Sequence, residues 1–146
     1  MRAMSLWQPW ASLMVHGHKR NETRSWSIEY RGRVLIHAAK RFQQEEREIC
    51  IYAPFAPCLA RHYNKLKDIP LGAIIGSVHI VDCVPTNWAV SRITDQERHF
   101  GNYADGRFAW ITENPVAFKE PVPFRGQQGF FNVPDELVPE EIRRKK

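Results

Sequence analysis

Residues 5–24 read SLWQPWASLMVHGHKRNETR and hold a helix start, a helix stop and a cluster of charges. Pro9 suits the first helical position, because its ring presets φ and its missing N–H would be unpaired there. Gly17 suits the left-handed residue that ends a helix. Between them three apolar residues repeat at helical spacing and form one stripe: Trp10, Leu13 and Met14. The stretch therefore predicts a short helix over 9–16 that lies on a core.

A charged cluster follows this helix. In a strand over 22–27, alternation places Glu22, Arg24 and Trp26 on one face, so the carboxylate and the guanidinium can touch. Such a pair can be a purely structural ion pair beside a buried tryptophan. Lys19, delivered by the turn after the helix, adds a second cation beside the pair. We interpret the cluster as a net positive spot suited to a phosphate or a polarised carbonyl.

The rest of the chain has the patterns of a sheet with a few helices. A helix with a proline interruption is predicted over 43–63. The long apolar run 71–84 carries Gly76 near its middle, which is typical of a bulge where a small barrel turns a corner. Further strands are predicted at 2–7, 34–39, 107–113 and, as a proline-containing edge strand, 118–124. The sequence therefore predicts an α+β fold built on a small β-barrel.

Length and composition bound the class of protein. The 146 residues are 43% hydrophobic and 25% charged, which fits one compact domain over 1–146, with residues 135–146 as a frayed, charged tail. Three cysteines without a C-x-x-C pair favour neither a zinc site nor disulfides. The sequence has no apolar run long enough for a signal peptide or a membrane span, so we expect a cytoplasmic protein that does not bind membranes.

Charge is concentrated at one end of the sequence. Residues 1–41 hold eight Lys or Arg and two Glu, a balance of +6, whereas the whole chain carries +5. A basic third that also contains the charged cluster is the electrostatic pattern of a polyanion-binding protein, with nucleic acid the commonest partner. A basic surface that serves only solubility is the alternative.

Several catalytic patterns are missing from the sequence. It contains neither a phosphate-binding G-x-x-x-x-G-K-[ST] loop nor a G-x-S-x-G nucleophile turn. His16 and His18 have no carboxylate at a ligand-like spacing, so we expect no metal and no cofactor. His37 lies in a buried strand and is interpreted as a core histidine.

Five ordered motifs resemble the ASCH domain, the activating-signal-cointegrator homology domain. Residues 17–24 match its G-x-K-x-x-E-x-R signature, and residues 5–11 resemble the opening of the cointegrator-like branch of the family. Tyr30-Arg31-Gly32, the strand from Gly72 to Cys83 and the Gly126-x-Gln128-Gly129 ending follow in order. The resemblance implies a PUA-like mixed barrel of five to six strands with flanking helices.

The resemblance also implies a cleft between the first helix and the barrel, and RNA as ligand or substrate. Lys19, Glu22 and Arg24 would line this cleft, with Gln8 at its edge. Some smaller members of the superfamily remove the acetyl group of N4-acetylcytidine with the signature lysine, a threonine and a glutamate. Here Glu22 and, by strand alignment, His79 occupy the last two positions, which departs from that pattern.

Three functions are therefore compatible with the sequence. The favoured one is an RNA-binding or other nucleic-acid-binding module, in which Lys19, Arg24 and Arg31 meet phosphate and Trp10 or Tyr103 stacks on a base. The second is a metal-independent ribonuclease in which Glu22 or a histidine accepts the 2′-hydroxyl proton and Lys19 and Arg24 stabilise charge on phosphorus. The third is an amidohydrolase acting on a modified nucleoside, with Lys19 and Glu22 as the candidate catalytic residues.

Overall fold

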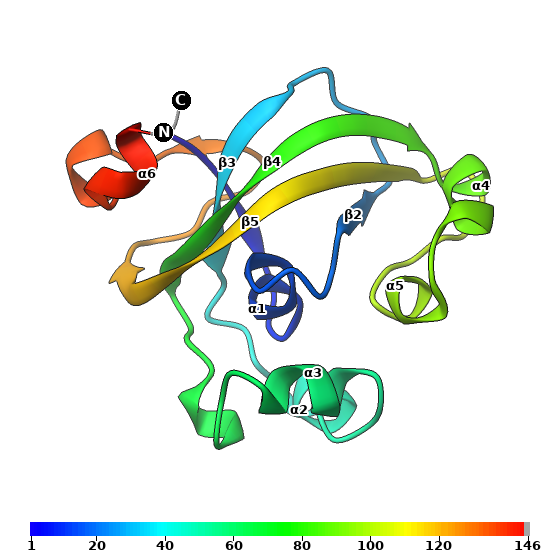
Figure 1. Cartoon of the computed structure of the whole chain (residues 1–146), viewed down its shortest axis with the longest axis horizontal. Helices are drawn as coiled ribbons and strands as arrows, with labels where there is room; N and C mark the ends of the chain where they lie inside the picture. The colour runs from blue at the N-terminus through cyan, green and yellow to red at the C-terminus, as the bar shows by residue number, and fades with distance from the viewer. Residues whose placement is uncertain (145–146) are drawn as a thin grey trace.

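The computed structural model describes residues 1–144, which form one six-stranded sheet with helices packed against it (Figure 1). The order across the sheet is β2-β5-β4-β3-β1-β6. Its strands are β1 (Arg2–Leu6), β2 (Asn21–Arg24), β3 (Gly32–Ala38), β4 (Ala73–Pro85), β5 (Phe108–Pro123) and β6 (Phe131–Asn132). Among these strands, only β1 and β3 pair in parallel. The mixed α+β class is confirmed.

The predicted barrel is not closed by hydrogen bonds between the described strands. β2 and β6 are the two edges of the sheet, and β6 covers β1 only at Arg2 and Ala3. The part of β1 from Met4 to Leu6 therefore faces β2, and within residues 1–144 no ladder joins the two. We call this gap in the barrel wall the seam.

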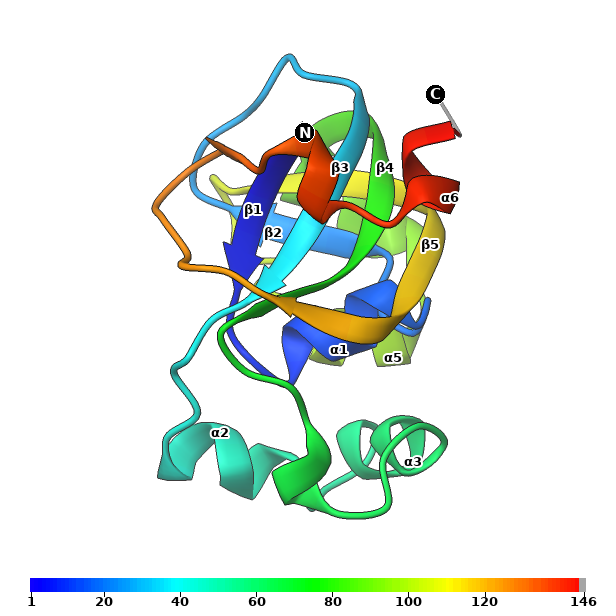
Figure 2. The same cartoon turned by 90° about the vertical axis from the view of Figure 1, so that its left-hand side faces the viewer.

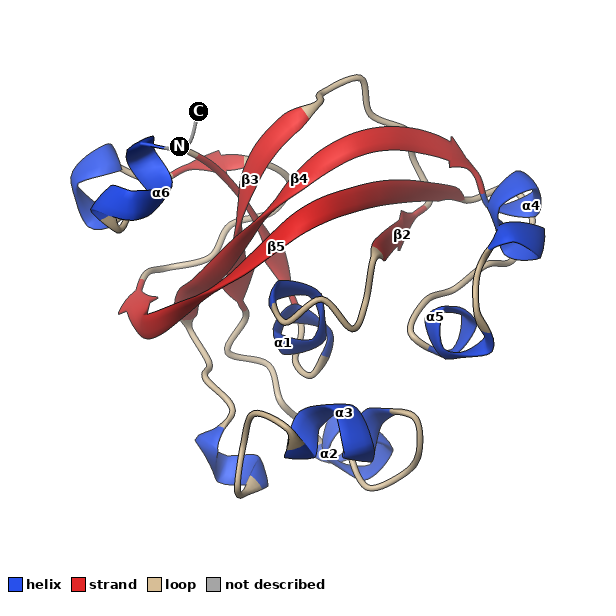
Figure 3. Ribbon diagram, viewed as in Figure 1, coloured by secondary structure: helices blue, strands red, loops and turns tan. Residues whose placement is uncertain are grey.

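The two long strands, β4 and β5, bend over the first helix (Figure 3). The predicted irregularity at Gly76 is confirmed, because the β4–β5 register shifts between Ile74 and Gly76. A Cβ at Gly76 would lie 2.3 Å from the Val116 carbonyl oxygen and 2.6 Å from a Val15 methyl, so only glycine fits. β5 continues through the segment predicted as a separate edge strand. Its prolines are accommodated because β2 covers only Phe108–Ile111, which leaves the rest of β5 as an edge.

The helices cover the sheet from several sides (Figures 1 and 2). They are α1 (Trp10–Val15), α2 (Gln44–Ile49), α3 (Phe55–Ala60), α4 (Thr86–Ala89), α5 (Asp95–His99) and α6 (Glu140–Arg144), with 3-10 turns at Leu66–Asp68, Val90–Arg92 and Asp135–Leu137. One face of α1 packs on the concave side of the sheet, through Met14 and Val15. Leu13 on its other face packs with α2 and α3. Gly17 has φ +81° and ends α1, as predicted.

The expectation of a frayed tail is wrong for residues 135–144. Val138 and Ile142 are buried against Ala3, Leu35 and Phe131, so α6 closes a second core beside the N-terminal strand. The prediction rested on the many charged residues of this segment. Its apolar residues Val138 and Ile142 hold it against the core. Residues 145 and 146 of the predicted tail lie outside the described residues.

Candidate nucleic-acid-binding cavity

The turn after α1 fixes the position of Lys19. The backbone N–H groups of His18 and Lys19 both donate to the Leu13 carbonyl, at 2.9 and 3.0 Å. This closes the helix end and turns the chain toward β2. The Lys19 side chain is thereby directed under the strand that carries Glu22.

Lys19 is buried and fully engaged by the protein. Its side chain is 2% exposed, and its ammonium donates to the Asn21 carbonyl and, at 3.0 Å, to the Phe100 carbonyl. Its Nζ lies 3.6 Å from Glu22 Oε1. The ammonium group of Lys19 is therefore directed at protein groups, and this lysine holds the floor of the site together.

Glu22 joins Lys19 to Arg24, and Arg24 bridges the seam. Glu22 Oε2 accepts a hydrogen bond of 2.7 Å from Arg24 Nε, which confirms the predicted pair. Arg24 Nη2 also donates to the Ser5 carbonyl on β1, at 3.2 Å. One guanidinium thus replaces part of the missing β1–β2 ladder. Charge-assisted hydrogen bonds of this kind are stronger than neutral ones, so the bridge holds the two edges at a fixed separation.

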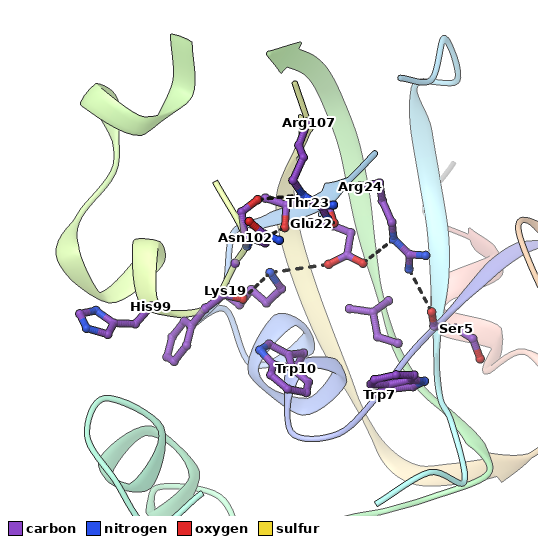
Figure 4. Close-up of a pocket in the computed structure, with 13 residues that line it drawn as sticks. Ser5, Trp7, Trp10, Lys19, Glu22, Thr23, Arg24, His99, Asn102 and Arg107 are labelled. Atoms are coloured by element: carbon purple, nitrogen blue, oxygen red, sulfur yellow. Dashed lines mark hydrogen bonds and ion pairs between the residues drawn. The ribbon is translucent and has the colours of Figure 1, made fainter. Parts of the chain in front are cut away.

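A cavity of about 640 Å³ opens above this floor (Figure 4). Its lining comprises Ser5, Leu6, Trp7, Trp10, Lys19, Glu22, Thr23, Arg24, His99, Phe100, Gly101, Asn102 and Arg107. Trp7 is half exposed at the mouth, whereas Trp10 packs edge-to-face on Phe55. We call this space the proximal cavity.

Arg107 supplies a second guanidinium at the proximal cavity. Its Nη2 donates to the Thr23 carbonyl and its Nε to the Asn102 carbonyl, both at 3.1 Å. The Thr23 hydroxyl in turn accepts from the Asn102 backbone N–H at 3.0 Å. Arg107 is thus oriented by neutral groups, and its charge is not cancelled by any acid among the described residues.

A buried carboxylate supports the same strand from behind. Glu97 of α5 accepts from the backbone N–H of Arg20, at 2.7 Å, and from that of Asn21, at 3.2 Å. Burial raises the pKa of Glu97, and these hydrogen bonds oppose that shift. The carboxylate ties α5, which brings His99 to the cavity, to the start of β2.

Three residues predicted for the site lie elsewhere. Gln8 is completely buried, and its amide bonds Ser12 and the Pro70 carbonyl, so it does not reach the cavity edge. Arg31 is on a loop, where it donates to the Ile28 and Tyr30 carbonyls and lies 3.7 Å from Asp82. Tyr103 accepts a hydrogen bond from Asn21, and burial raises its pKa to about 12. None of the three lines the proximal cavity.

His79 lies apart from Lys19. It lines a different hollow with Arg2, Tyr30 and Phe130, at the side of the sheet where β6 pairs with β1. The position aligned with the amidohydrolase glutamate therefore does not line the proximal cavity with Lys19. No group of three or more potential metal ligands occurs within residues 1–144.

Several residues of the site have no direct signal in the sequence. His99, Asn102 and Arg107 come from the segment between β4 and β5, whose composition predicts mainly loop. Arg107 lies at the cavity because its neighbour Phe108 of β5 pairs with Arg24 of β2, whereas the Glu97 carboxylate and the Thr23 hydroxyl hold the segment with His99 and Asn102 against β2. An arginine at the start of a predicted strand is the one available hint.

The open sheet, the helix in its concave face and the charged floor at the seam define a PUA-like domain. The family model for the ASCH domain matches residues 4–122, and the chain belongs to this family. Two curated relatives, activating signal cointegrator 1 of Mus musculus and of Homo sapiens, are each 27% identical over 134 residues. These matches cover 92% of this chain and 22% of each relative, so the chain spans about a fifth of their length.

Solved structures support the fold. A crystal structure of ASCH from Zymomonas mobilis has a TM-score of 0.57 at 16% identity and covers 93% of this chain and 89% of its own. A crystal structure of a mutant of that Zymomonas mobilis protein has a TM-score of 0.58 at 16% identity, with coverage of 99% and 96%. Within the described residues no helix is long and apolar enough to cross a membrane.

Proposed function

We propose that this ASCH domain binds RNA at the proximal cavity. The observation that carries the proposal is the pair of guanidinium groups, on Arg24 and Arg107, that border one cavity with a half-exposed tryptophan, Trp7. Guanidinium groups pair with phosphate oxygens, and aromatic rings stack on unpaired bases. The resemblance to a family generally linked to RNA binding points the same way.

The roles differ from those expected for the signature residues. Lys19 would set the floor and hold Glu22, while Arg24 and Arg107, which line the cavity, would meet phosphate. Trp7 is the better stacking residue, because it is half exposed whereas Trp10 packs against Phe55; the Arg41 guanidinium lies over one face of the Trp7 ring, so a base would stack on the other face. The Glu22 carboxylate can accept a hydrogen bond from a base amino group.

Salt-dependent binding tests the proposal. Fluorescence anisotropy with a labelled single-stranded RNA, repeated over a range of KCl concentrations, gives the affinity and its log–log slope. We expect Arg107→Ala to weaken binding and reduce the slope by about 0.7 units, because one phosphate contact to a single strand is lost. Arg31→Ala is the matched control, since Arg31 lies outside the cavity, and it should change neither quantity by as much. Salt-independent binding, or equal effects of the two variants, would contradict the proposal.

A metal-independent ribonuclease is the second candidate, and His99 is the observation that favours it. His99 Nδ1 hydrogen-bonds the Asp95 carbonyl at 2.7 Å, and a carbonyl only accepts, so Nδ1 carries the proton. In the neutral ring Nε2 is then an acceptor, and His99 is one of the residues that line the proximal cavity. It would take the 2′-hydroxyl proton while Arg24 and Arg107 stabilise the charge on phosphorus.

Cleavage assays separate this candidate from simple binding. RNA is incubated with purified protein and chelator, beside the variant His99→Ala. Cleavage that depends on His99 supports the ribonuclease, whereas cleavage that persists in the variant indicates a contaminant. For the amidohydrolase alternative, mass spectrometry of N4-acetylcytidine after incubation reports whether cytidine forms.

A further inference from the structure

The proximal cavity does not end at Arg24. A second hollow, which we call the middle hollow, shares Ser5, Trp7 and Arg24 with it. A third, the distal hollow, shares Ser5, Gln127 and Gln128 with the middle one. Their volumes are about 630 and 820 Å³. The three hollows therefore adjoin one another, and we treat them together as one groove.

The groove follows the seam of the sheet. Between Met4 and Leu6 the edge of β1 has no strand of the described chain beside it, and the Arg24 guanidinium crosses the gap to the Ser5 carbonyl. Figure 4 shows Arg24 and Ser5 meeting at this point, with Trp7 next to them. The open barrel thus leaves a long channel where a closed barrel would have a wall.

A fixed wall separates the core from the distal hollow. His37 Nε2 donates to the Phe124 carbonyl at 2.7 Å, so the other ring nitrogen, Nδ1, accepts from the Ser5 hydroxyl. A Cβ at Gly126 would lie 2.6 Å from the His37 ring and 2.8 Å from the Ser5 oxygen. The chain after β5 can therefore lie directly on this pair only because residue 126 is glycine.

The charge along the groove is positive except at Glu22. Arg107 and Arg24 stand at the proximal end and Lys40 and Arg125 at the distal end, and Glu22 is the one acid among the described residues that line the three hollows. Lys40 and Arg125 form no ion pair with any acid in residues 1–144. The stem of Lys40 packs over Gly72, where a Cβ would come within 3.1 Å of it. This contact holds the lysine at the hollow.

Aromatic and amide groups lie between these charges. Trp7 and Trp26, in the middle hollow, are 50% and 49% exposed. Gln127 and Gln128 are exposed beside them. Cations that follow a backbone, with aromatic faces between them, are the features that bind single-stranded nucleic acid without strict sequence preference.

We propose that the groove binds a continuous single strand of RNA, which runs from the proximal cavity over Trp7 and Trp26 to Lys40 and Arg125. This rests on the proposed RNA binding at the proximal cavity and extends it. A duplex keeps its bases stacked on each other, so the two tryptophans would have no base faces to contact. The ligand class is therefore an unpaired segment longer than one nucleotide.

Oligonucleotide length tests the extension separately from the proximal site. Affinities are measured for a dinucleotide, a dodecanucleotide and a duplex of the same length, with wild type and with Lys40→Ala/Arg125→Ala. The matched control is Lys67→Ala/Lys119→Ala, which removes two exposed lysines that line none of the three hollows. All variants should show the same circular dichroism spectrum, since all four side chains are exposed.

We expect Lys40→Ala/Arg125→Ala to bind the dodecanucleotide about tenfold or more weakly than the wild type. The log–log slope of affinity against salt should fall by about 1.4 units, because two phosphate contacts are lost. The dinucleotide should bind to this variant as it does to the wild type. Trp26→Leu should also weaken only the long ligand, by about tenfold. Equal loss for both lengths, no loss for either, or duplex binding as tight as single-strand binding would overturn the extended groove. If the wild type binds no oligonucleotide, the proposed function fails as well.

Discussion

The two ends of the groove are built in opposite ways. The proximal floor uses Lys19, Glu22 and Arg24, which are close in sequence and are bonded mainly to one another and to backbone carbonyls. The distal end brings Lys40 and Arg125 together from separate segments, and neither of them pairs with an acid within residues 1–144. The strongest sequence motif thus serves largely to hold the seam, although Arg24 also borders the proximal cavity, while Arg107, Lys40 and Arg125 pair with no acid among the described residues.

Among the variants that test this difference, replacing Lys19 should reduce the free energy of unfolding most. In Lys19→Met, the buried Glu22 carboxylate and two carbonyls lose their partner, so we expect the free energy of unfolding to fall by about 3 kcal/mol. Urea denaturation measures the change. Lys40→Ala, at the exposed distal end, should change stability by less than about 0.5 kcal/mol. A stable Lys19→Met protein would show that the proximal floor is not structural.

Gly126→Ala should give the next largest loss of stability. It tests whether the His37–Ser5 pair that bounds the distal hollow is rigid. The new methyl would meet the His37 ring at 2.6 Å and the Ser5 oxygen at 2.8 Å, so we expect a loss of about 2 kcal/mol from the forced shift. Gly106→Ala is the control: there φ is +84° but no atom lies within 4 Å, so only the backbone cost of about 1 kcal/mol applies. If thermal denaturation shows the same loss of stability for both variants, His37 and Ser5 can move to make room for the added methyl group.

Lowering the pH should reduce the free energy of unfolding by less than Gly126→Ala does, through the His37 side chain that contacts Ser5 and Phe124. Burial lowers the pKa of His37 below its usual 6.5, so folding favours the neutral ring. Its contribution is complete above about pH 6.5 and is lost as the pH falls through the lowered pKa. Burial also lowers the pKa of His16, to about 4, and adds to the same trend. Denaturation curves between pH 7 and 4 should show a decline that is smaller in His37→Gln, and an unchanged decline would assign the effect to other groups.

Local signals in the sequence are enough for several of the elements and for the proximal floor. The end of α1 at Gly17, the pairing of Glu22 with Arg24 and the irregularity at Gly76 are predicted correctly, because each depends on neighbouring residues or on one backbone conformation. The ordered motifs also predict the family correctly.

Other parts of the site cannot be predicted in this way. Gln8 is hydrophilic and close to the cluster in sequence, yet its side chain turns to the Pro70 carbonyl in the interior. Arg107 is far away in sequence and reaches the cavity through the β2–β5 register. The tail is a charge run in sequence, although Ile142 anchors it in a core that also contains residues far away in sequence, among them Ala3, Leu35 and Ile74.

The sequence by itself determined the helix, the turn and the strand that bring Lys19 to Glu22 and Arg24, since periodicity and backbone preference act over a few residues. Only the tertiary structure decided that the barrel stays open and that Arg24 bridges the gap. It also decided which cations remain unpaired along the seam. Strand order and ion pairing depend on residues far apart in the chain, and the charge of a residue does not tell whether a carbonyl, a carboxylate or solvent will face it.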